Sequence, residues 1–160
     1  MELPKRKSPR IPGYDYSTPN YYFITICTHD KRCNFGGPEK LGPYGRIAWE
    51  YLWEIPRHFP GIKVDKAVIM PNHVHAIIVV IAGTEEHSRR DLTIAIGQYK
   101  MAVTRIIRAK EQGKKVWQRS FHDHVIRNQK AYEKIWTYIH YNPQLWHKDG
   151  LYVIEEECKQ

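Results

Sequence analysis

The stretch Ala67-Val-Ile-Met-Pro-Asn-His-Val-His-Ala-Ile-Ile-Val-Val80 contains two short apolar runs separated by a polar interruption that begins at Pro71. Proline and asparagine favour a turn, so the runs are predicted to be antiparallel neighbours in a buried sheet. Successive strand side chains point to opposite faces, which places His73 and His75 on one face and Val74 on the other. Two neutral imidazoles on one face can bind a divalent metal ion. We expect the pair to be rigidly held yet accessible where the second strand begins.

The composition is that of a basic globular domain. Hydrophobic residues make up 42% of the 160 residues, enough for one packed domain. The formal net charge of +8 makes a polyanion the first partner to consider. Cys27, Cys33 and Cys158 form no Cys-x-x-Cys pair, which is typical of reduced thiols in the cytosol. The chain has no apolar run of membrane-spanning length and no signal-peptide pattern, so a cytoplasmic protein without membrane contact is expected.

Strand and helix patterns continue on both sides of the opening stretch. Before it, the segment Tyr21-Tyr-Phe-Ile-Thr-Ile-Cys27 is rich in aromatic and β-branched residues, which predicts a strand that we expect to be central. After it, apolar residues recur every three or four positions in two long segments, which predicts amphipathic helices. The predicted elements are a central strand at residues 21–27, helices at 44–55, 91–111 and 128–141, and a short strand or loop within 116–126.

Cations are concentrated on the outer face of the helix predicted at 91–111 and in the loop after it. Glu111 is the single acidic residue among them, so contact with phosphate is more plausible than a face that only meets water. A second basic segment near the N-terminus either follows phosphates or is disordered. The predicted phosphate contacts in these two regions are Lys5, Arg6, Lys7, Lys100, Arg105, Arg108, Lys114, Lys115 and Arg119.

The helix predicted at 128–141 carries a tyrosine beside its apolar stripe. Asn142 follows Tyr138 by four residues, which places both on one side of the helix. A phenol has a pKa of about 10, so it becomes a nucleophile only beside a base or near an electrophile activated by a metal. A metal on His73 and His75, with Asn142 as an oxygen ligand, would position a phosphate for attack by the phenol. From spacing alone, Tyr141, Tyr132 and Tyr99 remain alternative phenols.

Motifs follow one another along nearly the whole chain: Gly13-Tyr-Asp-Tyr16, Tyr22-Phe-Ile-Thr-Ile26, Met70-Pro-Asn-His-Val-His75, Val116-Trp-Gln-Arg-Ser-Phe121 with His124 and Ile126-Arg-Asn128, and Tyr138-Ile-His-Tyr-Asn-Pro143. Together these segments resemble the REP-associated tyrosine transposases, within the wider HUH superfamily of single-tyrosine DNA nucleases. The resemblance implies a ferredoxin-like α+β fold, with a central antiparallel β-sheet and helices packed against it. We expect a catalytic domain at 20–147, between a basic arm at 1–19 and a short acidic tail at 148–160.

This resemblance implies a site and an activity. His73 and His75 would bind Mg²⁺ or Mn²⁺, Tyr138 would be the nucleophile, and Asn142 would be a third ligand. The implied reaction is cleavage of single-stranded DNA beside REP-like hairpins, with a 5′-phosphotyrosine intermediate and a free 3′-hydroxyl. Replacing either histidine is expected to cost metal affinity but little stability, because side chains at the start of a strand bury little apolar area. The oligomeric state is left open, with a monomer favoured.

A second His-x-His, formed by His122 and His124, offers an alternative site. With the first pair it would supply four zinc ligands of a metallohydrolase that uses water as the nucleophile. Arg119 and Arg127 lie close in sequence, and a local excess of cations disfavours a further dication while favouring phosphate oxygens. We therefore expect His124 and Arg127 to contact DNA and His122 to be a surface residue. A hairpin-binding protein without activity is a further alternative.

Overall fold

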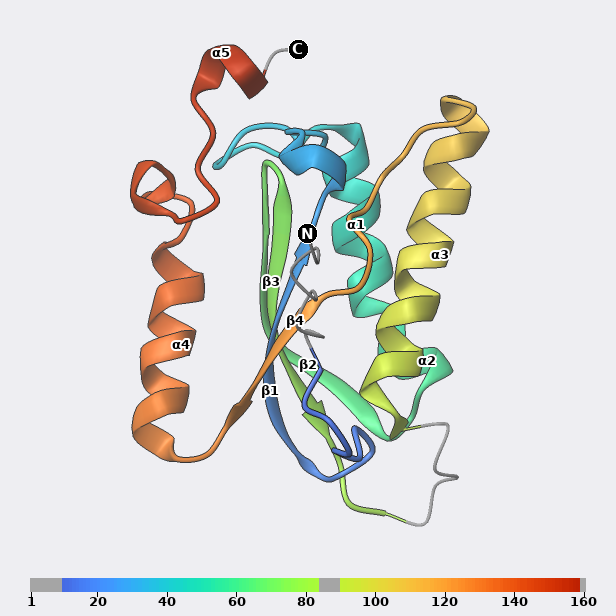
Figure 1. Ribbon diagram of the computed structural model, residues 1–160, viewed down its shortest axis with the longest axis vertical. Helices are drawn as coiled ribbons and strands as arrows, with labels where there is room; N and C mark the ends of the chain where they lie inside the picture. Colours follow the sequence, from blue (N-terminus) through green and yellow to red (C-terminus); the bar gives the residue numbers. More distant parts are fainter. Residues whose placement is uncertain (1–9, 84–89, 159–160) are drawn as a thin grey trace, which may run out of the picture.

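The structure is a computed structural model that describes residues 10–83 and 90–158. Four strands form one antiparallel sheet in the order β2-β3-β1-β4, with helices on both of its faces (Figure 1). The α+β class and the antiparallel sheet expected from the sequence are confirmed. The strands are β1 (Asn20–Cys27), β2 (Ile62–Met70), β3 (His73–Val80) and β4 (His122–Ile126).

The helices divide between the two faces of the sheet. On one face lie α1 (Pro43–Trp53), α2 (Ile55–His58) and α3 (Leu92–Lys110), and on the other lies α4 (Gln129–Tyr141) (Figure 1). The helix predicted at 44–55 ends at Trp53, and a second short helix, α2, begins at Ile55. Pro56 lies in the first turn of α2, where the missing backbone N–H of proline costs no helical hydrogen bond. Within the described ranges, no helix is long and apolar enough to cross a membrane. Short helices also occur in the connections: η1 (His29–Lys31), η3 (Trp146–Lys148) and α5 (Glu155–Cys158).

The turn at Pro71-Asn72 joins β2 and β3 into the predicted antiparallel hairpin. β1 lies between β3 and β4, so its predicted central position is also confirmed. Its register places Cys27 opposite His73 and Thr25 opposite His75. Because helices cover both faces of β3, its sequence is a nearly continuous apolar run rather than an alternating one.

Two hydrophobic clusters hold the layers together. The larger cluster lies between the sheet and the α1 and α3 helices, and the smaller one, around Ile77, Ile126 and Ile139, lies beneath α4. The start of α4 is fixed by Asn128, whose side chain accepts a hydrogen bond from the backbone N–H of Ala131 at 2.8 Å. This cap and the buried stripe set the rotation of α4 over the sheet, which decides where its polar side chains point.

The cysteines differ from the sequence-based expectation. Cys33 and Cys158 form a disulfide, and Cys27 remains free and buried. The expectation of three reduced thiols is therefore wrong for two of them. The paired residues are separated by 125 positions, and only the fold brings the loop after β1 close to α5, so their spacing gave no signal.

Residues 10–19 of the predicted basic arm pack against the domain, whereas residues 1–9 lie outside the described residues. Tyr16 is buried among the aromatic residues Tyr14 and Tyr22. Arg10 forms an ion pair with Asp123, whose side chain is inaccessible to solvent. This segment therefore covers part of the sheet next to β4.

Candidate metal centre and nucleophile

His73 and His75 lie side by side at the start of β3. Their ring centroids are 4.4 Å apart, so the prediction that both project from one face of the strand is confirmed. The expectation that they are accessible is wrong, because His73 is 0% exposed and His75 is 4% exposed. Side chains from α4 and from the segment after it cover them: Tyr138 contacts His75, and the ring of Trp146 lies 5.9 Å from that of His73.

Each imidazole has its Nδ1 fixed by a neighbouring side chain. Nδ1 of His73 lies 2.7 Å from Oδ1 of Asn72, and Nδ1 of His75 lies 2.9 Å from Oγ1 of Thr25. The amide of Asn72 is oriented because its Nδ2 donates to the carbonyl of Leu151 at 2.8 Å. Oδ1 of Asn72 is thus an acceptor, so Nδ1 of His73 carries a proton and Nε2 is the nitrogen that faces the site.

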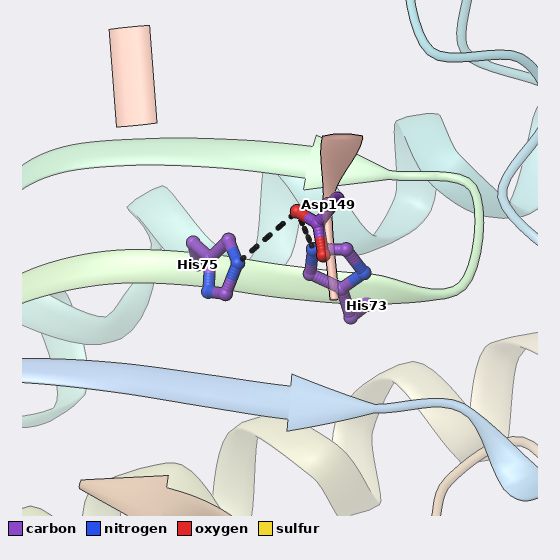
Figure 2. A group of neighbouring side chains, drawn as sticks. All are labelled: His73, His75 and Asp149. Carbon is purple, nitrogen blue, oxygen red and sulfur yellow. Dashed lines mark ion pairs between the residues drawn. The ribbon is translucent and has the colours of Figure 1, made fainter. Parts of the chain in front are cut away.

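A carboxylate that was not identified from the sequence completes this group. Oδ2 of Asp149, in the segment after α4, lies 3.5 Å from Nε2 of His73 and 3.9 Å from Nε2 of His75 (Figure 2). Its Oδ1 accepts a hydrogen bond from the backbone N–H of Leu151 at 2.7 Å. Burial acts to raise the pKa of Asp149, but the contacts with His73, His75 and the amide of Asn142 outweigh it and lower the pKa below its usual range. An ionised carboxylate therefore faces the two imidazoles.

The donor atoms of this group fit a divalent cation. The ligand atoms of His73, His75 and Asp149 all lie within 4.8 Å of one another. Nε2 of His73 and Oδ1 of Asn142 are buried and have no hydrogen-bond partner among the described residues. Asp149 and the two imidazole nitrogens that face it are therefore held together around a position that a cation could take. Imidazoles held by outer hydrogen bonds, together with oxygen ligands, are a donor set suited to a divalent metal such as Mn²⁺.

Tyr138 on α4 reaches the same group of side chains. Its hydroxyl donates to Oδ2 of Asp149 at 3.0 Å and lies 3.4 Å from Nε2 of His75. The ring meets Phe23 edge-on at 6.3 Å, and 43% of the residue stays exposed. Burial, followed by the charge and hydrogen bond of Asp149, raises the pKa of Tyr138 to about 12. The phenol therefore needs a nearby proton acceptor before it can act as a nucleophile.

Asn142 follows the last residue of α4 and lies near Tyr138. It keeps helical backbone angles, φ −55° and ψ −41°, although Pro143 follows and disfavours that conformation. Its Nδ2 donates to Oδ2 of Asp149 at 2.7 Å, so both α4 side chains meet the same carboxylate. The prediction that Tyr138 and Asn142 share one side of the helix is confirmed.

The alternative phenols point elsewhere. The hydroxyl of Tyr99 is buried and donates to a backbone carbonyl of α1 at 2.8 Å. The hydroxyl of Tyr132 donates to Asp65 at 2.6 Å. Tyr141 is exposed, and its ring meets His140 edge-on at 4.8 Å. Of the four phenols considered from the sequence, Tyr138 is the one in contact with the histidine pair.

His122 and His124 lie apart from the candidate metal group, on β4. Both are exposed, and the strand register places His122 opposite Thr25 and His124 opposite Phe23, on the same face of the sheet as His75. In the described parts of the chain, the candidate metal group contains neither of them. The four-histidine zinc site is therefore not assembled, and these two imidazoles instead border the open part of the sheet beside Tyr138.

Four of the predicted DNA-contacting cations line one open groove of about 830 Å³ between α3 and residues 117–120: Lys100, Arg105, Arg108 and Arg119. Nζ of Lys100 donates to the carbonyls of Gln118 at 2.8 Å and Ser120 at 2.7 Å. Burial, followed by the nearby charge of Arg10, lowers the pKa of Lys100 to about 8. This ammonium group therefore holds the 117–120 segment against α3.

The remaining predicted cations are more dispersed. Nζ of Lys114 lies 3.2 Å from Glu111, Lys115 and Arg127 are exposed, and Lys5, Arg6 and Lys7 lie outside the described residues. Contact of all these side chains with DNA remains a prediction.

The metal-free protein is expected to lose stability as the pH falls from 6.5 toward 4, because His75 must stay neutral. Burial lowers the pKa of His75 from 6.5 to about 4, and contact with Asp149 only partly opposes it. In this window the unfolded chain binds a proton that the folded chain does not, so the free energy of unfolding decreases by about 2 kcal/mol between roughly pH 7 and pH 5. Urea unfolding in EDTA measures this loss. A His75→Gln variant should lack it, and equal losses in both proteins would contradict the assignment.

Comparison with known proteins finds relatives in sequence and in structure. No family model matches this chain. An uncharacterized protein of Haemophilus influenzae is 36% identical over 171 residues, covering 92% of this chain and 93% of that protein. A solved REP-associated tyrosine transposase bound to a REP hairpin is 22% identical, with a TM-score of 0.65, covering 84% of this chain and 72% of that one. A candidate transposase of Deinococcus radiodurans is 16% identical, with a TM-score of 0.52, covering 82% of this chain and 95% of that one.

Proposed function

This chain belongs to one family with the Haemophilus influenzae protein and has the fold of the REP-associated tyrosine transposases, and on this premise we propose that it is a metal-dependent single-strand DNA endonuclease and transposase. It cleaves and rejoins DNA beside REP-like hairpins through a 5′-phosphotyrosine. The observation that carries the proposal is the hydroxyl of Tyr138, 3.0 Å from Asp149 and beside two buried histidines. The transposase of similar fold is bound to a REP hairpin, which supports hairpin DNA as the substrate.

In the proposed reaction, Oη of Tyr138 forms a bond to the scissile phosphorus, and the bond from that phosphorus to the 3′ oxygen breaks. The 5′ phosphate stays on Tyr138, and the leaving oxygen takes up a proton to become a 3′-hydroxyl. With a pKa of about 12, the phenol must give up its proton as the new bond forms. Oδ2 of Asp149 at 3.0 Å and Nε2 of His75 at 3.4 Å orient the hydroxyl, but their lowered pKa values make both groups weak bases, so the proton passes to water. Attack by the 3′-hydroxyl on the phosphotyrosine reverses these steps and rejoins the strand.

His73, His75 and Asp149 would hold the divalent ion, Mg²⁺ or Mn²⁺, with Oδ1 of Asn142 as a further ligand. When bound, the ion draws electron density from the scissile phosphate and stabilises the negative charge that develops there. The lowered pKa of His75 keeps that imidazole neutral and able to bind metal at neutral pH. Asn72 and Thr25 keep the two rings oriented, as outer partners of metal-binding histidines do.

Covalent attachment to DNA tests the proposal. The full chain is incubated with Mn²⁺ and a pool of labelled single-stranded DNA hairpins that carry single-stranded flanks, and the products are separated on denaturing gels. We expect labelled DNA that migrates with the protein and disappears when EDTA is added. Cleaved DNA without any protein-linked band would favour a metallohydrolase that uses water. Hairpin binding without cleavage would leave only a DNA-binding protein.

His124→Ala is expected to weaken DNA binding or slow cleavage severalfold, without changing Mn²⁺ affinity. His124 is exposed and pairs with Phe23 in the sheet, so it lies on the same face as His75, which contacts Tyr138. A neutral imidazole at this place can donate a hydrogen bond to a phosphate. His122→Ala is the matched control and should have a smaller effect. Calorimetric titration with Mn²⁺, beside DNA-binding and cleavage assays, separates the two roles. Loss of metal binding in either variant would restore the four-histidine zinc site.

A further inference from the structure

We propose that the groove between α3 and residues 117–120 binds the double-stranded stem of the hairpin, while the single-stranded flank is bound on the opposite face of the sheet. We call this surface the stem groove and define it by Lys100, Arg105, Arg108, Trp117 and Arg119. The inference rests on the proposed function, since it assigns two parts of a hairpin substrate to two surfaces.

The stem groove is positively charged. Arg105, Arg108 and Arg119 are exposed, and none of the described residues that line the groove carries a carboxylate. Arg105 and Arg108 lie one helical turn apart on α3, so both guanidinium groups face the same side of the helix. A guanidinium group offers several donors that match the oxygens of a phosphate. The surface therefore complements a polyanionic backbone.

Hydrogen bonds within the protein hold the rim of the stem groove in place. Nζ of Lys100 binds the carbonyls of Gln118 and Ser120, and the indole N–H of Trp117 donates to the carbonyl of Lys100 at 3.1 Å. These bonds attach the segment that carries Arg119 to α3. Lys100 is therefore a positioning residue. Arg105 and Arg119 are the proposed phosphate contacts, and Arg108 lies beside them with its Nε donating to the carbonyl of Lys114 at 2.9 Å.

The stem groove suits a duplex better than a single strand. Sites for single strands use exposed rings on which bases stack, whereas a duplex is held through its phosphates. Among the described residues that line the stem groove, Trp117 alone is aromatic, and its ring packs against Phe35 at 5.3 Å and Tyr99 at 5.9 Å. On the opposite face Tyr21 is 43% exposed and Phe23 lies beside Tyr138. Stacking surface is thus found on the nucleophile's face, and the stem groove offers mainly charge.

The chain itself connects the two surfaces. Residues 117–120 of the stem groove lead directly into β4, which carries His122 and His124 on the face of the nucleophile. Figure 1 shows this connecting segment running along α3 before it enters the sheet. Among the four described strands, β4 is at the edge and pairs with β1 alone. DNA that leaves the stem groove therefore reaches Tyr138 by passing around the outer edge of β4.

Binding of two DNA probes tests the inference. One probe is a blunt-ended hairpin without a flank, the other is an unstructured single strand of equal length, and both are titrated by fluorescence anisotropy in EDTA over a series of salt concentrations. Arg105→Ala and Arg119→Ala should each weaken binding of the blunt hairpin severalfold and reduce its salt slope by about one unit. Binding of the unstructured strand should stay within about twofold of wild type. Lys130→Ala, which removes an exposed cation from the first turn of α4, is the matched control and should leave binding of the blunt hairpin unchanged.

Two results would overturn the inference. Equal weakening for both probes would mean that the groove binds single strands as well, and unchanged hairpin binding would mean that it binds no DNA. The measurement does not depend on cleavage. If the chain forms no covalent adduct but Arg105→Ala and Arg119→Ala still weaken only the blunt hairpin, the proposed nuclease function is wrong and the stem groove stands.

Discussion

Tyr138→Phe is expected to abolish the covalent protein–DNA adduct and strand cleavage while hairpin binding stays close to wild type. The substitution removes the attacking oxygen and keeps the ring that packs against Phe23 and His75. Activity should fall by a factor of at least about 10³, because the loss of a nucleophile removes the covalent step itself. Denaturing gels measure the adduct, and fluorescence anisotropy with the same hairpins measures binding.

Tyr141→Phe is the matched control for that experiment. Tyr141 lies on the same helix and is exposed, but its ring contacts His140 and not His73 or His75. This variant should form adduct at the wild-type rate. Undiminished adduct in Tyr138→Phe, together with its loss in Tyr141→Phe, would assign the nucleophile to Tyr141.

His73→Ala is expected to remove Mn²⁺ binding and, with it, cleavage. Wild-type protein should melt at a higher temperature when Mn²⁺ is added, because the ion binds the folded state alone, and the variant should show no such rise. The sequence-based expectation that stability is hardly affected does not hold for a side chain that is 0% exposed. We expect the metal-free variant to lose about 1–3 kcal/mol of unfolding free energy through the cavity and the unpaired Asn72 oxygen.

His122→Ala controls for the loss of a histidine as such, because His122 is exposed on β4 and contributes nothing to the candidate metal group. Its melting temperature should rise with Mn²⁺ as wild type does. A rise of normal size in His73→Ala would show that the ion binds elsewhere. Isothermal titration with Mn²⁺ at a temperature where both variants are folded separates lost affinity from lost stability.

The parts of the site that follow local periodicity could be read from the sequence. His73 and His75 are two positions apart on a strand, and Tyr138 and Asn142 are four apart on a helix, so each pair had to share a face. The order of the elements and the position of β1 inside the sheet followed from apolar patterns of the same kind. Burial of the histidines did not follow, because it depends on the packing of α4 and Trp146 over β3.

Asp149 illustrates what local patterns leave out. It lies between two short helical turns, in a segment without periodicity, and no spacing rule connects it with His73 or His75. The same holds for the bond of Lys100 to the carbonyls of Gln118 and Ser120, which changes a predicted phosphate contact into a positioning residue. Both depend on contacts between segments distant in sequence, which only the assembled fold determines.

The place of Asp149 along the chain has a consequence for biosynthesis. The four described strands and α4 all precede this residue, and its carboxylate is held by the N–H of Leu151, which comes later still. Domains fold as units while the chain emerges from the ribosome, N-terminal parts first. Since Asp149 follows every described strand and α4 along the chain, the candidate metal group can be completed only after the sheet and α4 have been made. A chain interrupted before this residue would keep the histidine pair and lack the carboxylate that faces it.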